Sequence, residues 1–219
     1  MKKILFVCTG NTCRSPLAEA IFKKYQPSGY EVKSAGVHAL EGMAMSEGAR
    51  TVLSQRGIEE NHRATTLSKE IMEWADIILT MTENHRRAVI DQFPYIAEKV
   101  YSLKEYILDD PKTQEKIQQL KHHMAQLELK RATFLANNQN QIEKYNETND
   151  ISNQEHLEEK LLQELQPDHE AIAQLTAELP SFDVADPYMS DVSVYNETYL
   201  ELEAAVKKLV NKLQGENDK

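Results

Sequence analysis

The chain has 219 residues, enough for one ample domain or for one domain with an extension, and its formal net charge at pH 7 is −10. This charge disfavours binding to nucleic acid or to an anionic membrane, and no apolar run approaches membrane-spanning length. The only cysteines, Cys8 and Cys13, cannot form the disulfide framework of a secreted scaffold. Because Cys8 interrupts the short apolar run at the start, that run does not qualify as a signal peptide, and we expect a cytoplasmic protein.

Short apolar runs alternate with helical patterns along the first half of the chain, and this order predicts a parallel sheet with crossover helices. The predicted strands are 3–7, 31–34, 76–81 and 99–103. The predicted helices are 16–25, 43–56, 68–74 and 83–92, with a last helix near 195–213. Thr82 can cap the fourth helix, Gly57 can end the second, and Trp74 is expected in the core. The expected fold class is therefore α/β, a four-stranded parallel sheet with flanking helices.

The segment between the first predicted strand and helix reads Cys8-Thr9-Gly10-Asn11-Thr12-Cys13-Arg14-Ser15. Backbone N–H groups in such a loop, together with the positive end of the following helix, can bind an oxyanion. The guanidinium of Arg14 matches two phosphate oxygens, and a Cys8 thiolate is a good nucleophile to which Ser15 can donate a hydrogen bond. The segment thus predicts thiol-based phosphoryl transfer. The alternative, a buried structural cysteine beside a surface arginine, is disfavoured by the positions of Gly10, Ser15 and Pro16.

This segment resembles the signature of the low-molecular-weight protein tyrosine phosphatase family. Further stretches that resemble the family are 32–37, 75–82, 100–106 and 184–188. The resemblance covers about residues 1–110 and 181–213, is closest to the protein-arginine-phosphatase subgroup, and implies a phosphocysteine intermediate on Cys8 with no metal or cofactor. It assigns phosphate binding to Thr9, Gly10, Asn11, Thr12, Cys13, Arg14 and Ser15. It also implies that Asn11 and Ser34 shape the loop through hydrogen bonds.

A proton donor is needed because the leaving group departs poorly without one. Members of the family use an aspartate followed by proline, and the candidates are Asp110-Pro111 and Asp186-Pro187. Asp186 is favoured because Tyr188 and a final amphipathic helix follow it, whereas Asp110 is typical of a helix cap before an N1 proline. We expect Asp186 to protonate the leaving group and then to activate the water that cleaves the phosphocysteine. Met189-Ser190 stand where arginine-phosphatase relatives tend to have glycines.

Thr12 bears on the choice of substrate, because in the family this position faces the leaving group. Tyrosine-directed members commonly carry an aliphatic residue there, and threonine resembles the arginine-directed subgroup. The threonine hydroxyl can meet a polar, planar guanidinium, so a phosphoarginine-bearing protein is the favoured substrate and phosphotyrosine is the alternative.

The two cysteines permit a second prediction. Cys13 could capture an oxidised Cys8 as a disulfide, or it could simply fill space. The arsenate reductases of this fold that use a thiol relay need further cysteines, which argues against that activity. A non-catalytic phosphate-binding module is also less favoured, because Cys8, Arg14, Ser15 and Asp186 are all present.

Residues 112–180 contain no glycine and carry apolar residues at helical spacing on both sides of Asn146–Asp150. They predict an antiparallel helical hairpin inserted into a phosphatase domain formed by 1–111 and 181–219. Ser152 with Glu155 resembles a capping box, and Pro167 should kink the second arm or restart a helix. A solvated spacer is the simplest interpretation; the alternatives are a docking or dimerisation arm that positions a protein substrate or gates the loop carrying Asp186, and a disordered segment. The histidines show no metal-ligand spacing.

Overall fold

The computed structural model describes residues 1–148 and 151–217, with side chains within 1–143 and 155–215. The chain forms two compact units, Met1–Leu108 with Phe182–Lys219, and Asp109–Ser181. Within the described residues, no helix combines the length and the apolar character needed to cross a membrane.

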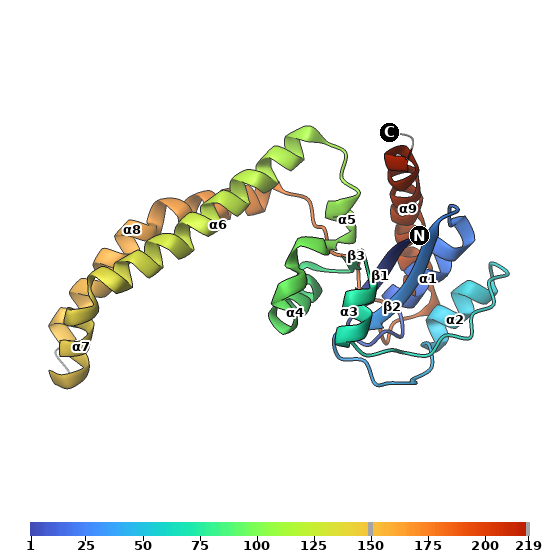
Figure 1. Cartoon of the computed structure of the whole chain (residues 1–219), viewed down its shortest axis with the longest axis horizontal. Helices are drawn as coiled ribbons and strands as arrows, with labels where there is room; N and C mark the ends of the chain where they lie inside the picture. The colour runs from blue at the N-terminus through green and yellow to red at the C-terminus, as the bar shows by residue number, and fades with distance from the viewer. Residues whose placement is uncertain (149–150, 218–219) are drawn as a thin grey trace. The chain divides into compact units, whose positions relative to one another are not determined.

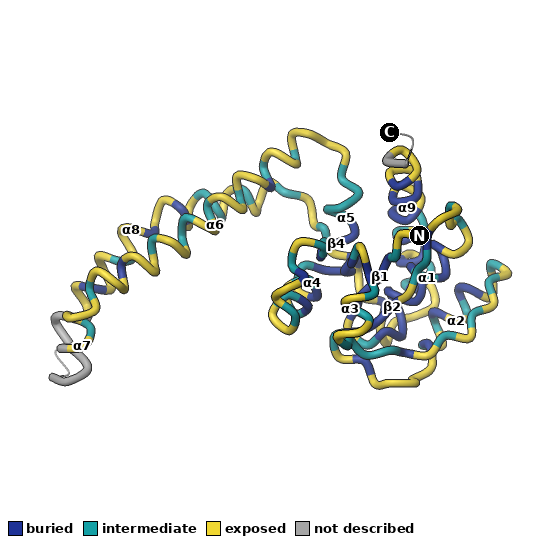
Figure 2. Tube along the Cα trace, in the orientation of Figure 1, coloured by how far each residue is buried: buried dark blue, intermediate teal, exposed yellow. Residues whose placement is uncertain are grey.

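The first unit is built on a four-stranded parallel sheet in the order β2-β1-β3-β4 (Figure 1). Its strands are β1 Lys2–Cys8, β2 Tyr30–Gly36, β3 Ile77–Thr80 and β4 Val100–Ser102. β1 lies in the interior of the sheet and is buried from Ile4 to Cys8 (Figure 2), which explains its unbroken apolar run. The α/β prediction and all four strands are confirmed.

Helices cover both faces of this sheet. They are α1 Arg14–Tyr25, α2 Glu47–Ser54, α3 Lys69–Trp74, α4 Glu83–Gln92, α5 Leu103–Tyr106 and α9 Val192–Asn217, with a 3-10 helix at Pro94–Lys99. Because side chains alternate along a strand, Ile4 and Phe6 pack in one core with α1, α2 and α9, while Leu5 and Val7 pack in another with α3 and α4. Trp74 packs against the second core and is only partly buried.

The predicted helix 43–56 is too long by several residues at its start, because α2 begins only at Glu47. Residues 43–46 are extended and hydrogen-bonded elsewhere: Ala64 N donates to Met43 O at 2.8 Å and Ser46 N donates to Thr12 O at 2.9 Å. These tertiary bonds override the local helical pattern. Gly57, with φ of 67°, ends the turn after α2 as predicted.

The second unit contains α6 Pro111–Asn137, α7 Gln139–Thr148 and α8 Ile151–Glu178, with α6 and α8 packed as an antiparallel pair. Asp110 caps α6 as predicted and accepts from Thr113 N at 3.0 Å. The first arm is not one helix, since it breaks at Asn138 into α6 and α7. The predicted turn is helical through Thr148, and its last residues lie outside the described ones, as do the side chains of the proposed capping box up to Gln154.

Pro167 lies inside α8, so of its two predicted outcomes the restart of a helix there was wrong, while a kink in this arm stays a prediction. Packing against α6 secures the residues on either side of it. Leu165 and Asp168 are both buried, and Asp168 accepts from His123 Nδ1 at 2.8 Å and Lys130 Nζ at 2.5 Å. These two donors, the histidine first, hold the pKa of Asp168 below its usual range. The seam therefore contains a buried ionic group as well as apolar residues, and this group favours one register of the two helices.

Candidate active site

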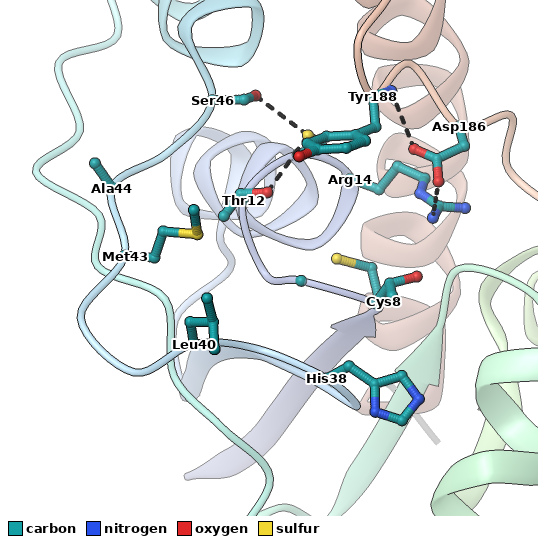
Figure 3. Close-up of a pocket in the computed structure, with 13 residues that line it drawn as sticks. Cys8, Thr12, Arg14, His38, Leu40, Met43, Ala44, Ser46, Asp186 and Tyr188 are labelled. Atoms are coloured by element: carbon teal, nitrogen blue, oxygen red, sulfur yellow. Dashed lines mark hydrogen bonds and ion pairs between the residues drawn. The ribbon is translucent and has the colours of Figure 1, made fainter.

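A pocket of about 330 Å³ opens at the carboxyl end of β1, where open α/β sheets bind ligands (Figure 3). Its lining residues are Cys8, Thr9, Gly10, Thr12, Cys13, Arg14, His38, Leu40, Met43, Ala44, Ser46, Asp186 and Tyr188. The structure thus brings the predicted nucleophile, arginine and acid together from opposite ends of the chain. The alternative acid, Asp110, caps α6 and does not line this pocket.

The loop joins a thiol at the end of β1 to a guanidinium at the start of α1, as the sequence predicts. Cys8 Sγ lies 3.0 Å from Ser15 Oγ, and the thiol is buried beneath the pocket. The positive end of α1 and the inward N–H groups of the loop make this a favourable place for an anion. The arrangement can therefore hold a phosphate directly against the sulfur.

Asn11 stabilises the loop from within. Its backbone is left-handed, with φ of 52°, a conformation that asparagine tolerates better than most residues. Its Nδ2 donates to Ser15 Oγ at 2.9 Å and to Ser34 Oγ at 2.8 Å, and its Oδ1 accepts from Thr65 N at 2.8 Å. The predicted partners Asn11, Ser15 and Ser34 thus form one hydrogen-bonded group, although their part in turnover stays a prediction.

The direction of these bonds orients the hydroxyl protons. Ser34 Oγ accepts from the Asn11 amide and donates its own proton to Glu19 Oε2 at 2.5 Å. Ser15 Oγ likewise accepts from Asn11, which leaves its proton for Cys8 Sγ or for Ala35 O at 3.3 Å. Glu19 was not identified from the sequence, because its only signal there is a place in an ordinary helical pattern.

Arg14 is buried, and its two terminal nitrogens bond to different partners. Its Nη2 pairs with Asp186 Oδ2 at 2.6 Å, and its Nη1 donates to Val184 O at 3.2 Å. Its Nε is buried and has no hydrogen-bond partner among the described residues. A buried N–H without an acceptor is costly, so this group is an available donor for a bound anion.

Asp186 lies at the pocket edge with its side chain 49% exposed, and its Oδ1 accepts from Tyr188 N at 3.2 Å (Figure 3). Met189, which follows, is exposed and has φ of 61°. This is the left-handed region that glycine enters without steric cost. The chain thus keeps a glycine-like backbone at Met189 despite the departure from the expected glycines.

Thr12 and Cys13 lie side by side in the pocket wall, with Thr12 Oγ1 3.6 Å from Cys13 Sγ. Cys13 Sγ also lies 3.2 Å from Ser46 Oγ and 3.5 Å from Tyr195 OH. Burial, followed by the hydrogen bond with Cys13, raises the pKa of Tyr195 to about 12, so this phenol keeps its proton at neutral pH. Cys8 and Cys13 are both free thiols, and both interpretations of Cys13 stay predictions.

The side chains of two histidines hydrogen-bond to the loop, although the sequence offered no reason to select them. His85 Nε2 lies 2.8 Å from Thr9 Oγ1, and His62 Nε2 lies 2.8 Å from Asn11 O. Neither shows a recognisable spacing to the loop, so only the fold reveals them. Across residues 1–148 and 151–217, no cluster of three or more His, Cys, Asp or Glu could hold a metal ion.

The fold and pocket define an α/β phosphate-binding protein in which a thiol faces an arginine and an aspartate. A family model described as "Low molecular weight phosphotyrosine protein phosphatase" matches residues 3–145. The chain belongs to this family, which confirms the resemblance seen in its sequence.

Relatives of known class include both substrate types. The protein-arginine-phosphatase of Geobacillus stearothermophilus is 48% identical over 105 residues, which are 48% of this chain and 71% of the relative. The low molecular weight protein-tyrosine-phosphatase PtpB of Staphylococcus aureus is 42% identical over 109 residues, 48% of this chain and 73% of the relative. The solved YwlE arginine phosphatase from Geobacillus stearothermophilus aligns with a TM-score of 0.65 at 30% identity, covering 99% of this chain and 95% of that one.

Proposed function

We propose that this chain is a cysteine-dependent protein phosphatase that hydrolyses phosphoarginine on proteins through a phosphocysteine intermediate. The observation that carries the proposal is one pocket in which Cys8, the unpartnered Nε of Arg14 and Asp186 converge. The arginine phosphatases among the relatives support the choice of substrate.

In the first step, the Cys8 thiolate attacks phosphorus, so that an S–P bond forms while the P–N bond to the substrate guanidine breaks. Asp186 donates a proton to the departing nitrogen. Arg14 and the loop N–H groups stabilise charge on the equatorial oxygens. The guanidinium that pairs with Asp186 is also the one that the phosphate needs, so a phosphate bound to Arg14 frees the carboxyl to turn toward the leaving group.

In the second step, Asp186 takes a proton from water, whose oxygen attacks phosphorus as the S–P bond breaks. Inorganic phosphate and the Cys8 thiolate are the products, and the Ser15 hydroxyl 3.0 Å from the sulfur stabilises the thiolate. In this scheme the protein supplies the nucleophile, the general acid and base, and the groups that stabilise charge, while water and the phosphorylated substrate are the other reactants.

Thr12 supports phosphoarginine over phosphotyrosine, because its small polar side chain lines the pocket where an aliphatic residue would pack on a phenol ring. The test compares the turnover of phosphoarginine and phosphotyrosine peptides by wild type and Thr12→Ile. We expect the substitution to shift preference toward phosphotyrosine, and Thr176→Ile, at an exposed site on α8, to leave it unchanged. Equal shifts in both variants, or none, would remove Thr12 from this role.

A non-catalytic phosphate-binding module is distinguished with a chromogenic aryl phosphate. We expect vanadate-sensitive hydrolysis by wild type, with Cys8→Ser losing turnover while retaining phosphate binding. Wild-type protein that binds phosphate but hydrolyses nothing would contradict the proposed activity.

We place the enzyme in the cytoplasm, where a reducing environment keeps Cys8 as a free thiol, and cell fractionation checks this.

The insert is a second site where a protein could bind, because the side chains of Met124, Leu129, Leu135 and Leu162 are exposed. Sedimentation of the full chain over a range of concentrations tests self-association; a constant monomer mass would exclude it.

A further inference from the structure

His85 is a buried histidine that contacts the phosphate loop (residues 8–15) from outside the pocket. It lies in the first turn of α4 and is 7% exposed. Its Nε2 lies 2.8 Å from Thr9 Oγ1 and its Nδ1 lies 2.9 Å from Thr82 Oγ1. Both ring nitrogens are therefore engaged with hydroxyl groups, one of them on the residue directly after Cys8.

The surroundings of the ring favour the neutral imidazole. A neutral ring has one donor and one acceptor nitrogen, and two hydroxyls can satisfy either tautomer. A charged ring would donate from both nitrogens, so both threonine hydroxyls would have to accept from it, and Thr82 Oγ1 would then accept twice, because it also accepts from His85 N at 3.2 Å. Burial first, and then the charge of Arg14, lower the pKa of His85 to about 4, while Asp186 and Asp183 act in the opposite direction more weakly.

Apart from the bond to His85, the described part of the chain holds Thr9 through its backbone, where its carbonyl accepts from His38 N at 2.9 Å. Thr9 is exposed, so water could satisfy the hydrogen-bonding capacity of its hydroxyl without His85. The bond to His85 instead restricts the start of the loop from a second side. It limits how far the backbone next to Cys8 can move.

The segment that carries His85 also bonds to residues 183–184, which lead into the loop that carries Asp186 (the acid loop). Val184 N donates to Met81 O at 2.8 Å, and Glu83 N donates to Asp183 Oδ1 at 2.9 Å. Residues 81–85 therefore contact the phosphate loop through one side chain and the base of the acid loop through two backbone groups. This short segment is a common support for the two halves of the catalytic apparatus.

We propose that His85 is a positioning residue, whose ring fixes the Thr9 hydroxyl and so sets Cys8 in register with the acid loop that carries Asp186. The inference rests on the proposed phosphatase function. Because the ring does not line the pocket, its loss should misplace the reacting groups without removing a contact to substrate. We therefore expect kcat to fall and KM to stay nearly constant.

The experiment measures kcat and KM on an aryl phosphate for His85→Phe, His85→Gln, Thr9→Val and the double variant His85→Phe with Thr9→Val. We expect His85→Phe to lower kcat about tenfold, as a small misplacement would. His85→Gln, which can still reach the Thr9 hydroxyl, should recover part of that loss. The double variant should be no slower than the worse single variant, because both remove the same bond.

His169→Phe, an exposed histidine on α8, serves as the control and should match wild type. Multiplicative losses in the double variant, or a loss expressed in KM alone, would overturn the positioning role while leaving the phosphatase function intact. If His85→Phe does not fold, Thr9→Val alone decides the matter, since it should lower kcat with an unchanged melting temperature, and an unchanged kcat would refute the role. An inactive wild type would overturn the proposed function and this inference together.

Discussion

Gly36 offers a sharp test of how rigidly the phosphate loop is supported. It ends β2, beside Cys8 in the sheet, and a Cβ at this position would lie 2.5 Å from Thr9 O and 2.8 Å from Asn11 N. Both are backbone atoms of the loop, and ordinary contact begins only near 3.4 Å. In Gly36→Ala the loop and the strand end must therefore separate by roughly 0.6–0.9 Å, on the scale at which misplacement costs catalysis.

Neighbouring hydrogen bonds prevent β2 from simply moving away. Val37 N donates to Cys8 O and His38 N to Thr9 O, each at 2.9 Å, and Gly36 N donates to Thr65 O at 3.0 Å. The displacement should thus fall largely on the loop. Since about 1 Å of misplacement costs on the order of a hundredfold in rate, we expect kcat/KM to fall by about 10- to 100-fold.

The assay is aryl phosphate hydrolysis, with the melting temperature followed in parallel. Gly215→Ala, on α9 with nothing within 4 Å of the added methyl, is the matched control and should keep full activity. If kcat/KM of Gly36→Ala stays within about twofold of the wild-type value, the loop can shift without loss of activity. The close contact between Gly36 and the loop would then not matter for turnover.

Three further outcomes are expected. Asp186→Asn should lower kcat by about 10²- to 10⁴-fold on phosphoarginine peptides, and less on an aryl phosphate with a good leaving group; equal losses on both would argue against a general acid. Because its partners depress the pKa of Asp168, the stability that this group contributes is present at neutral pH and is lost as the pH falls below the usual carboxyl range; circular dichroism should show loss of helix there, and Asp168→Asn should weaken that acid transition, leaving the part due to Glu178, whose pKa is also lowered. Replacing residues 109–181 by a short glycine-serine linker should preserve kcat/KM, since Lys104 Nζ donates to Asp183 O at 2.7 Å and so keeps the two flanking segments together; a large loss of activity would give the insert a catalytic role.

The sheet could be predicted because its information is local. β1 is apolar without interruption since both faces are covered, and the loop that follows carries its chemistry within eight consecutive residues. Asp186 could be selected because the two Asp-Pro pairs have different neighbours. Where tertiary bonds decide the outcome, the local pattern failed: residues 43–46 are not helical, although the pattern predicts a helix from residue 43.

Three supporting groups could not be predicted, because each depends on a contact between segments that are distant in the sequence. His62 and His85 contact the loop from the segment before α3 and from α4, and Glu19 on α1 accepts from Ser34 rather than from the loop. No spacing in the sequence links these three residues to the site. The Arg14–Asp186 ion pair is likewise visible only in the folded chain. The sequence thus identified the reacting groups Cys8, Arg14 and Asp186 and the loop partners Asn11 and Ser34, while the fold was needed to find the other groups that hold them.

The same contacts bear on whether the insert could gate the acid loop. Any such motion would have to pass residues 183–184, which immediately precede the acid loop. Asp183 accepts from Glu83 N and from Lys104 Nζ, and Val184 donates to Met81 O and accepts from Arg14 Nη1. Shifting Asp186 through the chain would break several of these bonds, each worth about 0.5–1.5 kcal/mol. The base of the acid loop is therefore anchored to the phosphatase unit, and this anchoring favours a spacer role for the insert over a gate.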